Sequence, residues 1–269
     1  MKFDFKEAII KILPKLIKLL KKLGLWAIGL GATMGVWFLA AYLIDNPVLL
    51  PNPILVWNTF VDSWQNGLPM NILASFWRVT QGVFLAAALS IFLGLVSTQV
   101  RWVRKFCLKF CEYLGRVPPT AVGPLLLLIF GIGEGAKVSL VFLVVFVAYL
   151  PYCIRIYEGV PRDKINAAKS YGLNRWELMR RVVIRETLPD ILMGIIPQYA
   201  AGWTFVLVAE AIATKVGIGR LIQIASSRSN VKLAWALLIV MIVINTVFDG
   251  VSKWALRKAF EWRYKNDET

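Results

Sequence analysis

The chain contains no histidine and only three cysteines among its 269 residues. Without histidine it can build neither a Ser-His-Asp triad nor an HExxH metal site. Cys107 and Cys111 are four residues apart, a spacing that suits zinc on a helix, but no second cysteine pair completes the ligand set. We therefore expect no catalytic residue and no metal site, and we interpret the cysteines as free thiols in a reducing compartment.

The sequence also lacks a loop for nucleotide phosphates. The segment from Gly131 to Ser139, GIGEGAKVS, is rich in glycine, but a phosphate-binding loop requires glycine directly before its lysine. Here Ala136 precedes Lys137. We therefore expect that this chain binds no cofactor of its own.

Charged residues are scarce at 17%, whereas hydrophobic residues make up 58% of the chain and the mean hydropathy is +0.63. A soluble domain of this length is far less apolar. Runs long enough to cross the hydrocarbon core as helices lie at roughly residues 25–44, 79–98, 117–133, 138–157, 190–213 and 234–252. Prolines 118, 119, 124 and 197 are expected to break the third and fifth runs. The sequence predicts an all-α, polytopic membrane protein with about six transmembrane helices.

The net charge of +15 could suggest a nucleic-acid partner, but the cations follow the topology instead. Of the 31 lysines and arginines, 25 lie in the alternate segments 1–24, 99–116, 155–185 and 253–269. By the positive-inside rule, these segments and both termini face the cytoplasm. We predict an amphipathic helix on the inner leaflet at residues 1–24, a transmembrane domain at 25–257 and a cytoplasmic tail at 258–269. A solvated tail that only sets topology is the alternative for residues 1–24.

A polar loop at about residues 158–188 is predicted to form two short helices. Pro161 suits the start of the first helix, and Gly172 supplies the left-handed residue that ends it. Asn174 and Glu177 have the spacing of a capping box for the second helix. The outward face would carry Lys164, Lys169, Arg175, Arg180 and Arg181, while Trp176, Met179 and Val183 would pack on the ends of the spans.

Three interpretations of this loop compete. A DNA-binding helix-turn-helix has similar features, but the chain runs straight into a membrane span at Leu188, which leaves no fold to support the motif. A solvated loop whose charges only fix topology is the second interpretation. The third is a docking element for another protein.

The loop resembles the EAA loop of permease subunits of bacterial ABC importers. The matching positions are Ala167, Ala168 and Gly172, with Val182 and Ile184 for the later Ile and Leu; Asn166 replaces the Glu and Arg185 replaces the Pro. The segments 49–60, 116–138 and 202–222 are together similar to permeases of the nitrate, sulfonate, taurine and bicarbonate group.

The resemblance implies a mechanism and a set of partners. In this family the EAA loop is a coupling helix that sits on a cytoplasmic ATPase, a separate polypeptide that binds ATP and Mg. A homodimer of the permease, two ATPase subunits and an extracytoplasmic binding protein would form an importer of a small anion in the bacterial inner membrane, with no nucleic acid. The coupling residues implied are Asn166, Ala167, Ala168, Lys169, Gly172, Leu173 and Arg175.

Ionisable side chains within apolar spans are costly, so each is a functional candidate. Arg78 and Gln81 enter the second span from outside, and Glu210 lies near the outer end of the fifth. We hypothesise that Arg78 and Glu210, or Arg78 alone, border the outer part of the solute path, with Trp203 and Thr204 on the face of Glu210. A structural ion pair, snorkelling at the interface and simple aromatic packing are the alternatives.

Two further questions stay open at this level. An ion-coupled secondary transporter with Glu210 as its coupling site is the rival function. The outer cations Lys215, Arg220, Arg228 and Lys232 could guide an anion, meet a binding protein, or be a local exception to the topology rule.

Overall fold

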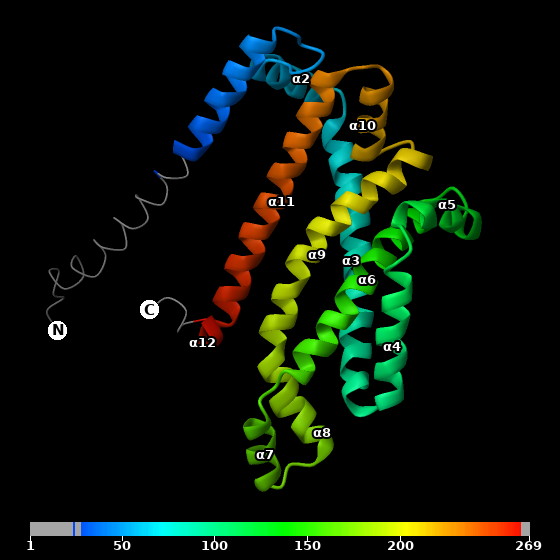
Figure 1. The fold of residues 1–269 in the computed structure, drawn as a ribbon, viewed down its shortest axis with the longest axis vertical. Helices are drawn as coiled ribbons and strands as arrows, with labels where there is room; N and C mark the ends of the chain where they lie inside the picture. The colour runs from blue at the N-terminus through cyan, green and yellow to red at the C-terminus, as the bar shows by residue number, and fades with distance from the viewer. Residues whose placement is uncertain (1–23, 25–27, 265–269) are drawn as a thin grey trace, which may run out of the picture.

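The computed structural model describes Gly24 and residues 28–264, and in this part every regular element is a helix (Figure 1). Apart from Gly24, the predicted amphipathic helix at residues 1–24 lies outside the described residues. The last five residues of the predicted tail lie outside them too. The all-α prediction is confirmed for the described chain.

Four helical stretches of the described chain are long and apolar enough to cross a membrane. Three are α3 (Leu68–Gln99), α6 (Glu134–Glu158) and α11 (Val231–Ala259). The fourth, Arg175–Ile212, is continuous and combines α8 (Arg175–Leu178), the π-helical turn η1 (Met179–Val183) and most of α9 (Ile184–Ala213). The first predicted span appears as a shorter apolar helix, Ile28–Ile44. The predicted number of six is therefore approximate.

The third predicted span, residues 117–133, is not a straight transmembrane helix. Its helix α5 (Pro119–Phe130) has 12 residues, about 18 Å at 1.5 Å per residue, against a core of about 30 Å. It meets α4 (Arg101–Leu114) at a bend of 103°. Pro119 stands at the first turn of α5, where proline fits, so the prolines start a short helix here.

The fifth predicted span was expected to be broken at Pro197, but α9 continues through Pro189 and Pro197 without a break. In a packed bundle, neighbouring helices can compensate for the backbone hydrogen bond that each proline removes. The run from the polar loop into the membrane is thus one uninterrupted helix.

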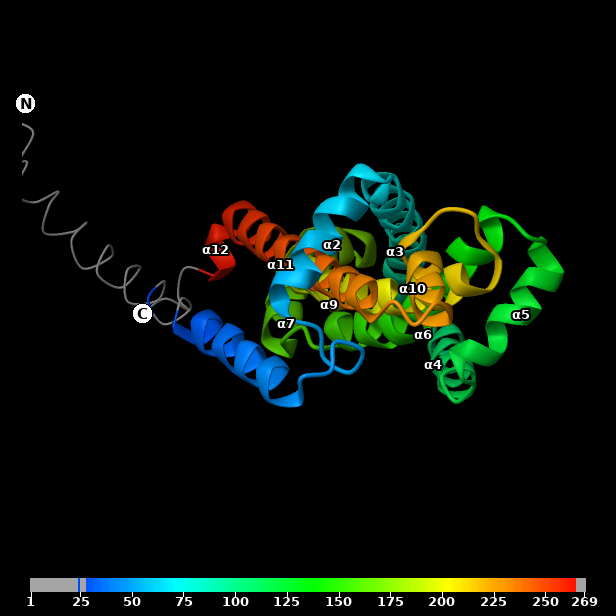
Figure 2. The same cartoon turned by 90° about the horizontal axis from the view of Figure 1, so that it is seen from above.

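The core is formed by α3, α6 and α9, which pack side by side (Figures 1 and 2). Gly82 of α3 lies so close to α6 that an added Cβ would stand 2.6 Å from Val141 Cγ1. The hydroxyl of Tyr149 on α6 donates a hydrogen bond of 2.5 Å to the carbonyl of Ile191 on α9. Small residues and an interhelical hydrogen bond are the usual means of joining helices in lipid.

Helices α4 and α11 run along the sides of this bundle, and shorter helices lie at its two ends (Figure 1). One end carries α2 (Pro53–Gln65) and α10 (Ile218–Ser227), and the opposite end carries the polar loop with α7 (Arg162–Ser170) and α8 (Figure 1). The short helix α12 (Glu261–Tyr264) follows α11 and is joined to the first turn of α9 by ion pairs of Arg263.

Candidate functional site

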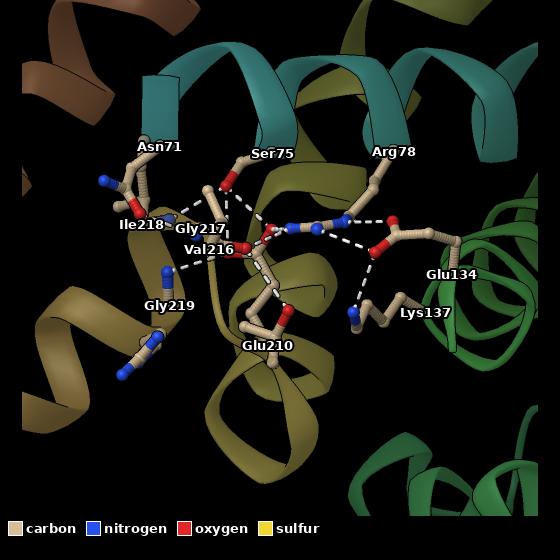
Figure 3. Close-up of polar contacts among 12 residues, drawn as sticks. Asn71, Ser75, Arg78, Glu134, Lys137, Glu210, Val216, Gly217, Ile218 and Gly219 are labelled. Atoms are coloured by element: carbon tan, nitrogen blue, oxygen red, sulfur yellow. Dashed lines mark hydrogen bonds and ion pairs between the residues drawn. The ribbon is translucent and has the colours of Figure 1, made fainter. Parts of the chain in front are cut away.

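A buried network of charged side chains joins α3, α6, α9 and the start of α10 (Figure 3). Asn71, Ser75 and Arg78 contribute from α3, and their spacing places them on one face of that helix. Glu134 and Lys137 come from the first turn of α6, and Glu210 comes from the last turns of α9. Residues far apart in the sequence therefore meet at one point.

Glu210 lies at the centre, and its side chain is completely buried. Its carboxylate accepts from the Ser75 hydroxyl at 2.7 and 2.9 Å, from Arg78 Nη1 at 2.7 Å and from the Gly219 N–H at 2.8 Å. A buried charge is tolerated only when it is paired and hydrogen-bonded. These donors meet that requirement for both carboxylate oxygens.

Arg78 carries the network to the outside of the bundle. Its Nε and Nη2 donate to the carboxylate of Glu134 at 2.5 and 2.9 Å, and Lys137 Nζ donates to the same carboxylate at 2.9 Å. Glu134 is the exposed member, with 61% of its side chain accessible. Two cations and two carboxylates thus balance each other in a continuous chain.

The same side chains hold the link between α9 and α10. Arg78 Nη1 donates to the Val216 carbonyl at 2.7 Å, and the Gly217 N–H donates to Asn71 Oδ1 at 2.8 Å. The Ile218 N–H donates to the Ser75 hydroxyl oxygen at 2.9 Å. The link therefore runs across α3 instead of standing free in solvent.

Glycine is required in this link. Gly217 has φ of +150°, and an added Cβ there would stand 2.4 Å from the Glu210 carboxylate. At Gly219 an added Cβ would stand 2.5 Å from the Leu207 carbonyl oxygen. Only glycine lets the backbone approach this closely.

The structure pairs Arg78 with Glu210, which is the structural ion pair that stood as the alternative to a place on the solute path. It does not place Trp203 and Thr204 on one face, because Trp203 is fully buried while Thr204 is exposed. Adjacent helical residues point about 100° apart, which explains that difference. Gln81 is half-buried. Whether these residues line a path stays a prediction.

Sequence reasoning missed five members of the network. They are Asn71, Ser75, Glu134, Lys137 and the glycine link at 217–219. A signal did exist in part, since Glu134 and Lys137 have opposite charges three residues apart at the start of an apolar span. The glycines carried no such signal.

The second candidate site is the loop at the opposite end. Gly172 has φ of +76°, and its N–H donates to the Lys169 carbonyl at 2.9 Å. The predicted capping box is confirmed, since Asn174 Oδ1 accepts from the Glu177 N–H at 2.9 Å and Glu177 Oε2 accepts from the Asn174 N–H at 3.1 Å. The short first helix and the glycine corner are therefore present as predicted, but the second helix is not a separate short one, because α8 continues through η1 into α9.

The packing of this loop was predicted in part. Met179 and Val183 are buried, but Trp176 is 69% exposed, because α8 projects beyond the ends of the neighbouring helices (Figure 1). Among the residues proposed for coupling, Ala168 is buried and Leu173 half-buried. The exposed ones are Asn166, Ala167, Lys169, Gly172 and Arg175.

The three cysteines are buried and free, and no group of metal ligands occurs among the described residues. Burial of Cys107 and Cys111 agrees with their interpretation as thiols.

Comparison with known proteins identifies the family of this chain. Residues 86–260 match the family described as the binding-protein-dependent transport system inner membrane component. The chain belongs to this family. It is a transport protein of the ABC permease class.

Two relatives illustrate the likeness of this permease. A Methanocaldococcus jannaschii protein, named as an ABC transporter permease, is 33% identical over 234 residues, covering 85% of this chain and 88% of that protein. The taurine transport system permease protein TauC of Escherichia coli is 30% identical over 200 residues, covering 70% of this chain and 71% of TauC.

A solved amino acid ABC transporter shares the fold. The TM-score is 0.64 at 14% sequence identity, and the match covers 74% of this permease and 96% of that chain. At this identity the likeness concerns the fold alone.

Proposed function

We propose that this permease is the transmembrane subunit of an ATP-driven importer that moves a small anion into the cytoplasm by alternating access. Two copies would form one path, with two ATPase subunits on the loop side and a binding protein on the other. The observation that carries the proposal is the projecting loop, in which α8 runs without a break into α9 as the single helix Arg175–Ile212.

This geometry suits mechanical coupling. ATP drives transport only if the ATPase binds one conformation of the permease more tightly than the other. The exposed residues Asn166, Lys169 and Arg175 offer a surface for such binding. Because a continuous helix does not hinge freely, displacement of α8 would move α9 with it.

An exposed strip on α9 supports the proposal of a second copy. Pro197, Ala200 and Thr204 recur at helical spacing and are exposed in the single chain. Helix interfaces in membranes are enriched in small residues because these let backbones approach. We assign this strip to the contact between two copies, where the path would lie.

The orientation follows from charge. The polar loop and α12 lie at one end of the bundle, and the surrounding segments hold most of the cations. The positive-inside rule puts that end in the cytoplasm. The C-terminus would then be cytoplasmic, and the same rule puts residues 1–24 there.

The solute is inferred from likeness and charge. Taurine is named for one relative, and a nitrate, sulfonate, taurine or bicarbonate type of anion is our proposal here. Four cations stand near α10 on the opposite side from the loop, with Lys215 and Arg228 exposed, and Arg220 and Lys232 half-buried. They would attract an anion or acidic side chains of a binding protein.

A secondary transporter that uses Glu210 as a proton carrier is the less favoured function. A carrier must exchange its proton with each side of the membrane in turn. Glu210 is fully buried, and its two oxygens already accept from Ser75, Arg78 and Gly219. These contacts suit a carboxylate with a structural role and do not suit a carrier that binds and releases a proton.

Reconstitution separates the two functions. The permease is purified with its ATPase and binding protein, sealed in liposomes, and supplied with taurine, nitrate, bicarbonate or an alkyl sulfonate. We expect one of these anions to stimulate ATP hydrolysis, and uptake to persist when a protonophore collapses the proton gradient. Uptake that needs the gradient and ignores ATP would overturn the proposal.

A further inference from the structure

Four charged side chains connect three helices at the end of the bundle that carries the loop. Lys164 of α7 donates to the Glu186 carboxylate of α9 at 2.6 Å. Arg263 of α12 donates to the same carboxylate at 3.2 Å and to Asp190 at 3.0 Å. Glu186 is thus shared between the loop and the helix that follows α11.

These ion pairs border an open space. A cavity of about 310 Å³ lies among the end of α6, the connector at 159–161, α7, the first turns of α9, and α12. Ile165 and Ala168 of α7 pack against the rest of the molecule. On the side of the cavity, which supplies no packing, α7 is held by side-chain links. Among the ion pairs of the described residues, Lys164 with Glu186 is the one that joins α7 to another helix.

Helix α11 otherwise meets α9 farther from the loop. The rings of Tyr199 and Phe248 stack with centroids 3.6 Å apart, and Phe248 precedes the end of α11 at Ala259 by about three helical turns. Arg263 therefore adds a second point of attachment, close to the loop. The planar guanidinium suits this role, since its separate nitrogens reach two carboxylates at once.

We propose that Arg263 is a positioning residue for coupling: through Glu186 it ties α11 to the loop helix α7, so that a displacement of the loop moves α9 and α11 together. The inference rests on the proposed function, because it assumes that an ATPase moves the loop. The ion pairs are partly exposed, so each contributes little to stability, and their effect lies in the shared geometry.

A reporter at the far end of the molecule tests the proposal without knowledge of the solute. An environment-sensitive fluorophore is attached at Ile132→Cys, a position that is 84% exposed, while Cys107, Cys111 and Cys153 are too buried to react. The labelled permease is assembled with its ATPase in lipid nanodiscs and trapped with ATP and vanadate. Wild type should change its emission on trapping.

Arg263→Gln should trap nucleotide as wild type does, yet its emission change should fall about twofold or more. The emission change of Glu186→Gln should be reduced similarly. The double variant should show an emission change no smaller than that of the more affected single variant, because both substitutions remove the same linkage. The matched control is Arg257→Gln, an exposed arginine of the last turn of α11 without an ion pair among the described residues.

If the emission change of Arg263→Gln equals that of wild type, the proposed role of Arg263 is overturned and the proposed function is not affected. If Arg263→Gln does not assemble, Glu186→Gln decides by the same criterion. If the wild-type complex traps nucleotide but shows no emission change, the proposed function is overturned, and the proposed role of Arg263 is overturned with it.

Discussion

Arg78 and Glu210 lie 132 residues apart in the chain and form a buried ion pair of 2.7 Å. The pair fixes the C-terminal end of α9 against α3, and further hydrogen bonds of the same two side chains fix the link to α10. Removal of Arg78 leaves the buried Glu210 without a cation, and removal of Glu210 leaves Arg78 and Lys137 with Glu134 as their one carboxylate. Breaking a buried pair in this way costs far more than the net value of the pair. The pair is therefore a structural requirement of this end of the bundle, whatever its part in transport.

Glu210→Gln should lower the free energy of unfolding by about 3 kcal/mol or more. The carboxylate balances Arg78 and accepts the Gly219 N–H, and a neutral amide does only the second. Thermal unfolding of the detergent-solubilised permease measures the loss. The double variant with Arg78→Gln should lose less than the sum of the two single losses.

Asp249→Asn is the matched control for this charge removal. Its partner Lys253 lies at 2.8 Å, but both side chains are nearly half exposed, so the cost should be about 0–1 kcal/mol. Equal losses at Asp249 and Glu210 would contradict the assigned role of burial.

If Arg78→Gln left both stability and uptake unchanged, the hypothesis that Arg78 borders the solute path would be lost as well.

Gly219→Ala should destabilise the permease by about 1–3 kcal/mol. The new methyl group would stand 2.5 Å from the Leu207 carbonyl oxygen, and backbone cannot move aside as a flexible side chain can. Gly250→Ala is the control, since nothing lies within 4 Å of its Cβ position in α11. That change should be neutral or stabilise by up to about 1 kcal/mol through helix propensity. Similar melting temperatures for the two variants would refute the close approach.

Local sequence signals predicted the local features well. Asn174 and Glu177 stand three residues apart, and Gly172 follows a helix, so the capping box and the corner could be predicted from neighbours in the chain. The pairing of Arg78 with Glu210 was also accessible, because a lone charge in each of two spans at similar depth needs a partner.

Features set by long-range packing could not be predicted in the same way. The 103° bend between α4 and α5 depends on how the chain folds back, and hydropathy alone reads residues 117–133 as a span. Glu134 and Lys137 join Arg78 only because α6 begins beside α3. The π-helical turn at Met179–Val183 has no compositional mark, although such turns often occur at functional sites.

Gly172→Ala should weaken the coupling of ATP hydrolysis to solute uptake, and Gly172→Asn should weaken this coupling less. Nothing lies within 4 Å of the Cβ position, so the cost comes from φ of +76° alone, about 1–2 kcal/mol for alanine. Asparagine adopts this conformation more readily. Solute-stimulated ATP hydrolysis and uptake in liposomes measure the effect. If alanine and asparagine behaved alike, the left-handed corner would not be what coupling requires.

Thr204→Trp tests the assignment of the exposed α9 strip to the contact between two copies. Thr204 is exposed in the single chain, beside the small residues Ala200 and Ala201. An indole would fill the space that two close backbones need, since small residues govern such contacts. We expect uptake to be lost and cross-linking between copies to decrease. Val247→Trp, at a 58% exposed position of α11, should retain both if that position faces lipid. Normal uptake by Thr204→Trp would place the contact and the path on another face, because a bulky ring cannot be accommodated between closely packed helices without moving them.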